Sequence, residues 1–147
     1  MAPPTRPRTQ RIQDTRDRLE RDEDLFVATA DPSGTPYLVP LSFLWDGTAL
    51  LISTPAASPT ARNLAAGKVR LALGPTRDVT IIEGTASPTE VSAEVGDAFA
   101  AKTGFDPRTL STPYQYFRIV PALIQAWREA NELSGRTLMR EGAWLDG

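Results

Sequence analysis

The stretch that decides the fold is residues 25–47, which read LFVATADPSGTPYLVPLSFLWDG. Its first six residues are typical of a strand, and Asp31–Gly34 has proline and glycine where a tight turn prefers them. A second, longer strand is predicted over Pro36–Trp45, and Asp46-Gly47 is a strong hairpin signal. A third strand over Thr48–Thr54 follows at once. The segment therefore predicts an antiparallel meander.

A short helix and two more strands are predicted directly after the meander. Ser58 is a natural N-cap, Pro59 suits the first helical turn and Gly67 is typical of a helix end. These signals predict a two-turn helix over residues 59–66. The polar and apolar alternation that follows predicts strands over residues 68–74 and 78–86.

The last third of the chain is predicted to contain a second helix and two strands. The run Ser87-Pro-Thr-Glu90 matches a capping box, which predicts a helix with Val91, Val95 and Phe99 on its apolar face. Gly104 would end this helix. Two strands, over residues 114–120 and 122–127, flank Pro121, which must lie at an edge, a bend or a bulge.

The order of these elements predicts a mainly β protein. Six or seven strands, most of them consecutive, combine with three short helices into an antiparallel barrel or a strongly bent sheet with helices at its ends. Strands and helices do not alternate, and no glycine-rich dinucleotide fingerprint is present. A Rossmann domain is therefore not expected.

The two ends of the chain differ from the strand-rich middle. Residues 1–9 contain three prolines and two arginines without apolar periodicity, and we expect a flexible or draped N-terminal arm. Residues 10–147 are expected to form a single domain, beginning with a charged surface helix over residues 10–24. Near the other end, Glu129 and Glu132 have helical spacing and are expected to be surface charges.

Composition excludes many kinds of chemistry. The 147-residue chain has no cysteine and no histidine, so disulfides, thiolate nucleophiles and histidine-containing triads or metal sites are not possible. A net charge of −2 disfavours nucleic-acid binding. No apolar run approaches the length of a membrane span, and the N-terminus does not resemble a signal peptide. We therefore expect a cytoplasmic protein that uses a bound cofactor or its own Arg, Lys, Asp, Glu, Tyr and hydroxyl groups.

The passage from the third strand into the short helix suits an anion. The hydroxyls of Thr54, Ser58 and Thr60 surround the start of the helix. Arg62 can bind two phosphate oxygens at once, and Asn63 adds an amide. The alternative interpretation is that Ser58 only caps the helix and that Arg62 forms a surface ion pair.

The second strand and the end of the last strand offer places for a planar ring. Pro40 removes one backbone donor from a long strand, so backbone groups near Leu41 and Ser42 are left for another partner. The alternative is a bulged strand at a corner of the barrel. Trp127 lies beside Arg128 and can flank a ring, although core packing or a dimer contact is the commoner role for such a residue.

Taken in order, these segments resemble the flavin- and deazaflavin-binding split β-barrel proteins of the pyridoxamine 5′-phosphate oxidase type. The resemblance covers about residues 11–127. It rests on residues 25–47, Thr54, Ala61–Ala65, Lys68–Leu73 and Ile82–Ala86. The late runs 124–129 and 135–140 are similar to an actinobacterial subgroup.

The resemblance implies a six-stranded antiparallel split β-barrel that works as a homodimer, with two cofactor sites at the interface. Relatives hold the flavin ring against the strand that matches residues 39–43, and we expect Pro40, Leu41 and Ser42 to contact the ring through their backbone. They hold the phosphate at the segment that matches residues 54–63, with Thr54 at the ribityl chain. In such dimers the partner often places an aromatic or arginine side chain over the ring, which suggests Trp127 or Arg128.

One position departs from the pattern of the deazaflavin-binding relatives. Many of them have a lysine where this chain has Thr60, so a hydroxyl replaces a cation. FMN, a deazaflavin such as coenzyme F420 and an empty site therefore remain open.

Three functions are compatible with the resemblance. The first is an FMN- or coenzyme F420-dependent oxidoreductase that transfers a hydride to or from a small organic substrate, although no side chain stands out as a catalytic proton donor. The second is a non-enzymatic flavin carrier, store or sensor. The third, a haem-handling relative, is disfavoured because the chain has no histidine to bind iron.

Overall fold

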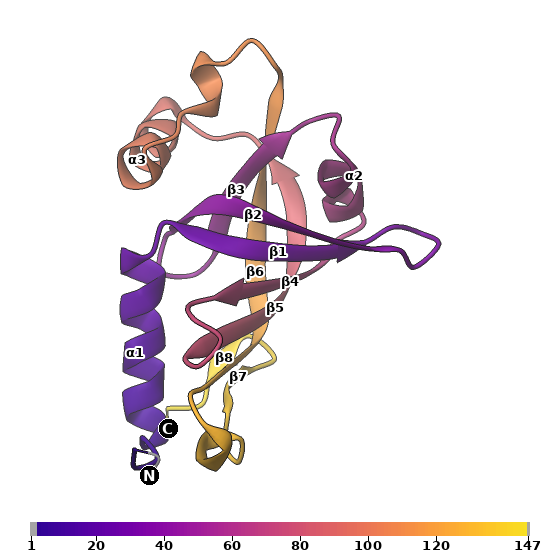
Figure 1. Cartoon of the computed structure of the whole chain (residues 1–147). Helices are drawn as coiled ribbons and strands as arrows, with labels where there is room; N and C mark the ends of the chain where they lie inside the picture. The colour runs from indigo at the N-terminus through magenta and orange to yellow at the C-terminus, as the bar shows by residue number, and fades with distance from the viewer. Residues whose placement is uncertain (1–2, 147) are drawn as a thin grey trace.

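Strand β3 (Leu50–Pro55) pairs with one strand on each edge, and this double pairing closes the sheet into a barrel. The computed structural model describes residues 3–146, and it has the mainly β, six-stranded antiparallel barrel that the sequence predicts (Figure 1). The order around the barrel is β3-β2-β1-β4-β5-β6, and β7 and β8 extend the sheet beyond β6. The remaining strands are β1 (Asp24–Ala30), β2 (Pro36–Trp45), β4 (Lys68–Leu73), β5 (Val79–Thr89), β6 (Tyr114–Trp127), β7 (Thr137–Arg140) and β8 (Ala143–Trp144).

Three helices lie around the barrel. In Figure 1, α1 (Arg8–Arg21) follows one side, close to both ends of the chain, and α3 (Ala93–Thr103) packs against β2. The short α2 (Pro59–Ala65) packs against β1 and β5 beside the hairpin that β1 and β2 form. Two 3-10 turns, η1 (Pro107–Thr109) and η2 (Ala130–Glu132), complete the described elements. None of the described helices is long and apolar enough to cross a membrane.

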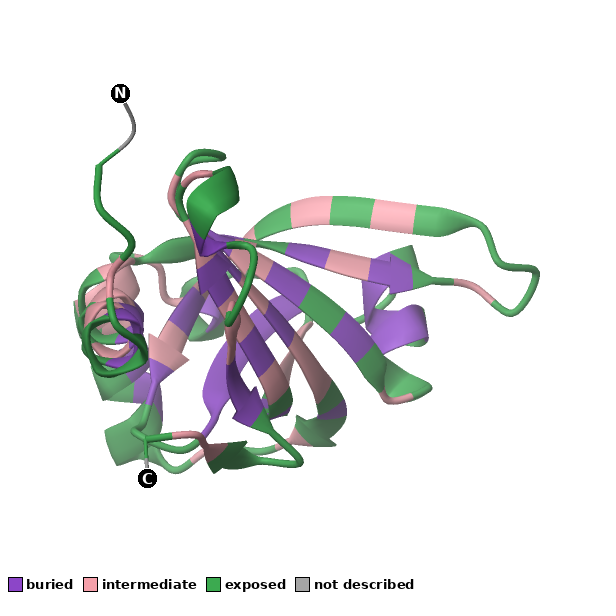
Figure 2. Cartoon of the chain, turned by 90° about the horizontal axis from the view of Figure 1, so that it is seen from below, coloured by how far each residue is buried: buried purple, intermediate pink, exposed green. Residues whose placement is uncertain are grey.

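Alternating side chains fill the barrel interior. Along β1 and β4, buried residues alternate with exposed or half-buried ones, as expected for strands with one face toward a core. Figure 2 shows this alternation on the barrel strands and shows the β1–β2 hairpin projecting beyond the barrel. The largest fully buried side chains of the barrel strands are Phe43, Leu50, Ile52, Leu71, Leu73, Ile82, Phe117 and Ile119.

Pro121 lies at a bulge within one long strand rather than between two strands. The register between β5 and β6 shifts between Glu83 and Gly84, which pair with Leu123 and Pro121. Ala122 is therefore the extra residue on β6. The strands approach closely here, because a Cβ at Gly84 would lie only 2.7 Å from the Val120 carbonyl oxygen. The predicted bulge is confirmed, while the predicted division into two strands is wrong.

The capping box predicted at Ser87 does not begin a helix. Strand β5 continues to Thr89, and Ser87 pairs with Arg118 of β6. The α3 helix begins five residues later than the capping box predicts, and its N-cap is Ser92, whose Oγ accepts a hydrogen bond from Val95 N at 3.2 Å. Pairing with the long β6 strand therefore outweighs the local capping signal.

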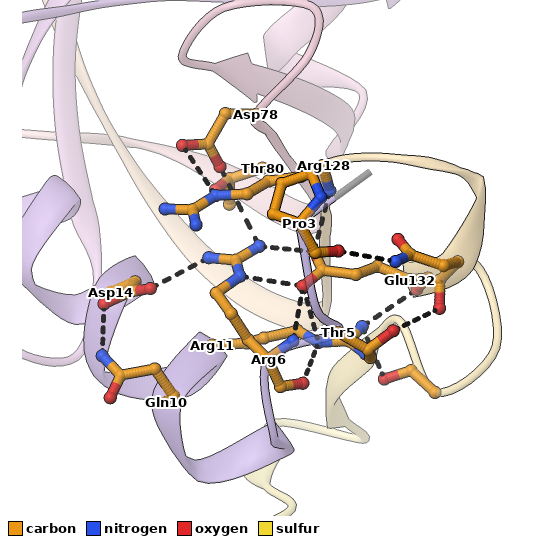
Figure 3. A network of polar contacts seen from close by, with 12 residues as sticks. Pro3, Thr5, Arg6, Gln10, Arg11, Asp14, Asp78, Thr80, Arg128 and Glu132 are labelled. Carbon is orange, nitrogen blue, oxygen red and sulfur yellow. Dashed lines mark hydrogen bonds and ion pairs between the residues drawn. The ribbon is translucent and has the colours of Figure 1, made fainter. Parts of the chain in front are cut away.

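The segment before α1 is held by a buried carboxylate. Glu132 is 2% exposed, and Arg6 donates to it from Nε at 3.0 Å and from Nη2 at 2.7 Å (Figure 3). Arg11, also buried, donates to the Glu132 carbonyl at 2.9 Å. The prediction of Glu132 as a surface charge is therefore wrong. The flexibility of residues 1–9 stays a prediction, and residues 1 and 2 lie outside the described residues.

A wider set of ion pairs surrounds this carboxylate. Arg6 also contacts Asp14 at 2.9 Å, and Asp78 contacts Arg18 at 3.2 Å and Arg128 at 3.3 Å. Hydrogen bonds from Arg6 lower the pKa of Glu132 from 4.5 to about 2, although burial alone would raise it. Because the folded-state pKa is depressed, the stabilisation is complete above pH 4.5 and is lost as the pH falls from 4.5 toward 2.

Replacing Glu132 tests this account. At pH 7 the Glu132→Gln substitution should lower the free energy of unfolding by about 3 kcal/mol, because the carboxylate no longer compensates the buried Arg6 guanidinium. The difference from the unsubstituted protein should shrink below pH 4.5. Urea unfolding at several pH values measures both effects.

Glu129→Gln is the matched control on the neighbouring turn. Glu129 is 37% exposed and pairs with Arg77 at 3.3 Å, so its loss should change stability by no more than about 0.5 kcal/mol. Equal losses for the two variants, or a Glu132→Gln loss that does not depend on pH, would contradict the account.

Candidate functional site

Strand β2 is longer than the pairing that joins it to β3. Only residues 43–45 of β2 pair with β3, whereas β1 pairs with β2 over residues 36–42. Over residues 36–42, the edge of β2 that faces away from β1 therefore has no strand partner within the described part of the chain. We call this the open edge.

The register identifies the backbone groups on the open edge. Phe43 N–H donates to the Glu23 carbonyl on the β1 side at 2.9 Å. Because the direction alternates along an antiparallel strand, the even-numbered residues of β2 direct their N–H and C=O groups to the open edge. Between residues 38 and 42, the donors there are Leu38 and Ser42, since Pro40 has no N–H.

Pro40 does not interrupt the pairing of β1 with β2. It lies opposite Phe26 in a continuous register, and its missing N–H would have pointed to the open edge. The prediction that Pro40 removes a bond from the ladder is therefore wrong, and so is the alternative of a bulge at this position. Ser42 Oγ donates to Asp24 Oδ1 at 2.7 Å, so Ser42 offers the open edge its backbone groups only.

A cavity of about 650 Å³ lies between α2 and the turn of the β1–β2 hairpin, next to the first residues of β2. Tyr37 of β2 and Lys68 of β4 contribute to the lining of the cavity. Arg62 and Asn63 of α2, two of the residues predicted to bind an anion, line this cavity. The other lining residues are Ala30, Asp31, Pro32, Pro59 and Ala66.

The two cations of this cavity, Arg62 and Lys68, have no carboxylate partner among the described residues. Most arginines of the chain form ion pairs, but neither Arg62 nor Lys68 forms one with any of residues 3–146. Arg62 Nη1 donates to the Ala57 carbonyl at 2.8 Å, which positions the guanidinium and leaves its other donors free. The expected surface ion pair of Arg62, the alternative interpretation, is not formed with a described residue.

Asp31 is the carboxylate among the described lining residues, and it is engaged within its own turn. Its Oδ1 accepts hydrogen bonds from Ser33 Oγ at 2.7 Å, Ser33 N at 3.0 Å and Thr35 N at 3.0 Å. The hydroxyl of Ser33 is the main cause of a lowered Asp31 pKa. Asp31 therefore stays ionised at neutral pH and leaves the cavity with a positive balance.

The start of α2 is held by its own hydroxyls. Ser58 Oγ accepts from Ala61 N at 3.0 Å, the expected N-cap, and lies 3.5 Å from Thr54 Oγ1. Thr54 and Thr60 are buried beside it. In the next turn, Asn63 Nδ2 donates to Thr29 Oγ1 of β1 at 3.2 Å, which fixes the side of α2 that faces the cavity.

Of the predicted site residues, Arg62 and Asn63 line the cavity and Thr54, Ser58 and Thr60 lie at or next to the start of α2, whereas Pro40, Leu41 and Ser42 lie along β2 outside the lining. Trp127 lies apart. Thr54 pairs with Gln115 near the start of β6, whereas Trp127 ends that strand opposite Val79. At about 3.3 Å per residue, roughly 40 Å of strand separates Gln115 from Trp127. A contact between Trp127 and this cavity would therefore require a second copy of the chain, and it stays a prediction.

Two residues of the cavity, Lys68 and Tyr37, were missed by sequence reasoning. Lys68 is one of two lysines in the chain, which is the signal that could have singled it out. Its pairing partner is Thr85, so only the fold reveals that it approaches Arg62 through a shared cavity.

A model of the family described as pyridoxamine 5′-phosphate oxidase matches residues 13–128. A search of curated proteins finds no match. Among solved structures, a putative pyridoxamine 5′-phosphate oxidase from Listeria innocua is similar, with a TM-score of 0.65 and 17% identity over 80% of this chain and 98% of that chain.

Two further solved structures share the fold. One, called an F420 reductase, has a TM-score of 0.56 and 19% identity over 74% of this chain and 93% of its own. The other, described as a FAD-binding protein from Mesorhizobium loti, has a TM-score of 0.63 and 16% identity over 77% of this chain and 89% of its own.

The hydrogen bond of Asn63 and the free position of Arg62 predict different effects on stability. Asn63→Ala should lower the free energy of unfolding by about 1–3 kcal/mol, because it leaves the buried Thr29 hydroxyl without its donor. Arg62→Gln should change it by less than about 0.5 kcal/mol, because the exposed Arg62 forms no ion pair with a described residue. Urea unfolding in cofactor-free buffer measures both, and a larger loss for Arg62→Gln would contradict this description of the site.

Proposed function

Because the chain belongs to the pyridoxamine 5′-phosphate oxidase family, we propose that it binds a flavin-type cofactor, FMN or the deazaflavin coenzyme F420. We further propose that it uses this cofactor to transfer a hydride to or from a small organic molecule. The observation that supports the proposal most is the cavity of about 650 Å³, which is lined by Tyr37 of β2 and by two cations that form no ion pair with a described residue.

The cavity fits the phosphate of such a cofactor. Arg62 can bind two phosphate oxygens in a bidentate manner, and Lys68 adds a point charge from the facing strand. Lys68 therefore supplies the second cation that Thr60 does not. Ser58 and Thr60 lie within one helical turn of Arg62, and Thr54 Oγ1 lies 3.5 Å from Ser58 Oγ. We assign these three hydroxyls to the ribityl chain and the phosphate oxygens.

The open edge fits the ring. Its donors at Leu38 and Ser42 and its carbonyl at Pro40 alternate, and the heteroatom edge of a flavin or deazaflavin ring also offers donors and acceptors. A ring bound there would receive backbone hydrogen bonds from residues 38–42, with the Tyr37 side chain at its phosphate side. The backbone is held by the full pairing of β1 with β2, so the edge is rigid before a ligand binds.

When bound, the flavin or deazaflavin supplies the hydride chemistry itself. The chain's own groups bind the phosphate, orient the ring and keep water from one of its faces. We assign no catalytic proton donor, because the pKa of Asp31 is lowered and its carboxylate is ionised at neutral pH.

A second copy of the chain is part of the proposal. Phe26 is 51% exposed and Leu38 is 66% exposed, and both lie on the outer face of the β1–β2 hairpin next to the open edge. Large apolar side chains grouped in this way favour a protein partner. A homodimer built on this face would cover the ring and could place the partner's Trp127 or the partner's Arg128 over it.

A flavin carrier, store or sensor is the alternative function. The ionised state of Asp31 favours it, because the cavity then has no carboxylic acid to protonate a substrate at neutral pH. Both functions require the same cofactor contacts and differ only in turnover.

Cofactor titration tests the proposed site. FMN and coenzyme F420 are titrated separately into the protein, with ligand fluorescence and absorbance as the signals. Arg62→Gln and Lys68→Gln should each weaken binding of the cofactor that binds by about tenfold or more, because each removes a charge-assisted hydrogen bond. Arg70→Gln is the matched control, since Arg70 lies on the same strand as Lys68 but pairs with Glu83 at 2.6 Å.

Two results would contradict the assignment of the phosphate site. One is an affinity unchanged in Arg62→Gln and Lys68→Gln, and the other is an equal loss in Arg70→Gln. Failure of both cofactors to bind below about 1 mM would contradict the proposed function itself.

Turnover separates the enzyme from the carrier. The protein is mixed with an excess of the reduced cofactor and a panel of enones and quinones, and oxidation of the reduced cofactor is followed by absorbance. Multiple turnovers with any substrate support the oxidoreductase. Tight binding of the cofactor with no turnover above the free-cofactor rate would support the carrier instead.

A further inference from the structure

A second cavity gathers the other arginines that lack a carboxylate partner. Arg8 of α1 and Arg136 and Arg140 of the β7 region line a cavity of about 240 Å³ near the ends of the chain. None of the three forms an ion pair with any residue between 3 and 146. Together with Arg62 they are the arginines of the described chain without such a pair, and three of the four meet at this one place.

No described carboxylate neutralises these charges. The cavity is lined by the three arginines with Gln125, Leu133, Gly135, Thr137 and Leu145, none of them acidic. Two nearby acidic residues form ion pairs with other arginines: Asp146 contacts Arg16 at 3.6 Å, and Glu132 contacts Arg6 at 2.7 Å. Like charges brought together in this way raise the free energy of the fold unless an anion binds between them.

Two of the three guanidinium groups are already positioned. Arg8 Nη1 donates to the Leu145 carbonyl at 3.4 Å, and Arg136 Nη1 donates to the Leu133 carbonyl at 3.2 Å. The guanidinium carbon of Arg136 also lies 5.6 Å from the centre of the Trp127 ring. Each of these contacts uses one donor of five, so most donors remain for a ligand.

The neutral polar groups add a hydroxyl donor. Gln125 Nε2 donates to Thr137 Oγ1 at 3.3 Å. Because that bond occupies a lone pair, the hydroxyl proton of Thr137 is free to donate to an acceptor in the cavity. The lining therefore offers guanidinium and hydroxyl donors and no described charged acceptor, which is the chemistry of an oxyanion site.

We propose that this arginine cavity binds a small polyanion of the phosphate class, such as pyrophosphate or the phosphate group of a larger molecule. A volume of about 240 Å³ is below the range typical of sites that enclose a whole drug-sized ligand. The site is separate from the Arg62–Lys68 cavity, because β6 extends from beside β3 at one end to Trp127 at the other (Figure 1).

The ligand would join elements from both ends of the sequence. Arg8 belongs to the first turn of α1, whereas Arg136 and Arg140 flank and end β7. A bound anion would therefore hold α1 against the β6–β7 sheet. The phosphate group has two possible sources, a free small molecule or the cofactor held by a second copy of the chain, and the experiment has an arm for each.

Calorimetric titration with pyrophosphate at constant ionic strength is the first arm. Arg140→Gln is the main variant, because Arg140 is exposed and its side chain forms no hydrogen bond or ion pair with a described residue. Arg8→Gln is the second variant. Each should weaken pyrophosphate binding by about tenfold or more. The control Arg21→Gln changes an arginine that is 71% exposed at the other end of α1 and should leave the affinity unchanged.

A second comparison separates this cavity from the proposed cofactor site. The double variant Arg62→Gln with Lys68→Gln removes the two cations of the proposed cofactor site, so pyrophosphate should still bind to it at the arginine cavity. Adding Arg140→Gln to this double variant should weaken that binding by about tenfold or more. The other arm titrates FMN into Arg140→Gln. A loss of pyrophosphate affinity in Arg140→Gln supports a free anion as the source, and a loss of FMN affinity alone supports the cofactor phosphate of a second copy.

Two outcomes would overturn the inference. One is that neither pyrophosphate nor FMN affinity changes in Arg140→Gln and Arg8→Gln. The other is that pyrophosphate binding disappears in the Arg62 and Lys68 double variant and persists in Arg140→Gln. The pyrophosphate titrations do not depend on flavin binding, so the inference can hold even where the proposed function fails.

Discussion

The short pairing between β2 and β3 is the constraint on which the rest of the structure depends. β3 pairs with β6 over its whole length but with β2 over three residues only, so the barrel closes while most of β2 leaves it as a hairpin with β1. The backbone of residues 38–42 is thereby left with donors and acceptors and no strand to receive them. The chain that ends β3 turns directly into α2, which brings Arg62 to a cavity that Tyr37 of β2 also lines.

The distribution of charge follows a second rule. At the end of the barrel near α1, arginines and carboxylates neutralise one another, and the buried Glu132 joins the segment before α1 to the turn after β6. Of the cations that remain unpaired with described carboxylates, Lys102 donates to the Leu19 carbonyl at 3.1 Å, and the other five gather at two places. Arg62 and Lys68 line one cavity, and Arg8, Arg136 and Arg140 line another. This separation is what distinguishes candidate anion sites from the ordinary arginines of the surface.

Short sequence signals correctly predicted the turns and helix caps, because the conformation of these elements depends mainly on neighbouring residues in the sequence. The Asp46-Gly47 hairpin has a glycine with φ of 95°, and Ser58 caps α2 as expected. Ser87 shows the limit of such signals, because its capping box is overridden by eleven residues of β5 paired with β6, a strand that begins 25 residues farther along the chain. Glu132 was mistaken for a surface charge because its partner, Arg6, is 126 residues away in sequence.

The candidate site could likewise be predicted only where its residues lie close together in the sequence. Arg62 and Asn63 follow a recognisable strand-to-helix passage, so residues alone indicated them. Lys68 and Tyr37 could not be assigned, because their approach to Arg62 depends on how β2 and β4 lie on the two sides of β1. The edge role of Pro40 likewise follows from the register with β1, which fixes the direction of every backbone group on β2.

A crystal structure of the protein with bound FMN tests the central claim most directly. The account predicts the phosphate between the side chains of Arg62 and Lys68, and the ring along the backbone of residues 38–42. A phosphate bound away from both cations, or a ring with no backbone contact to β2, would contradict it.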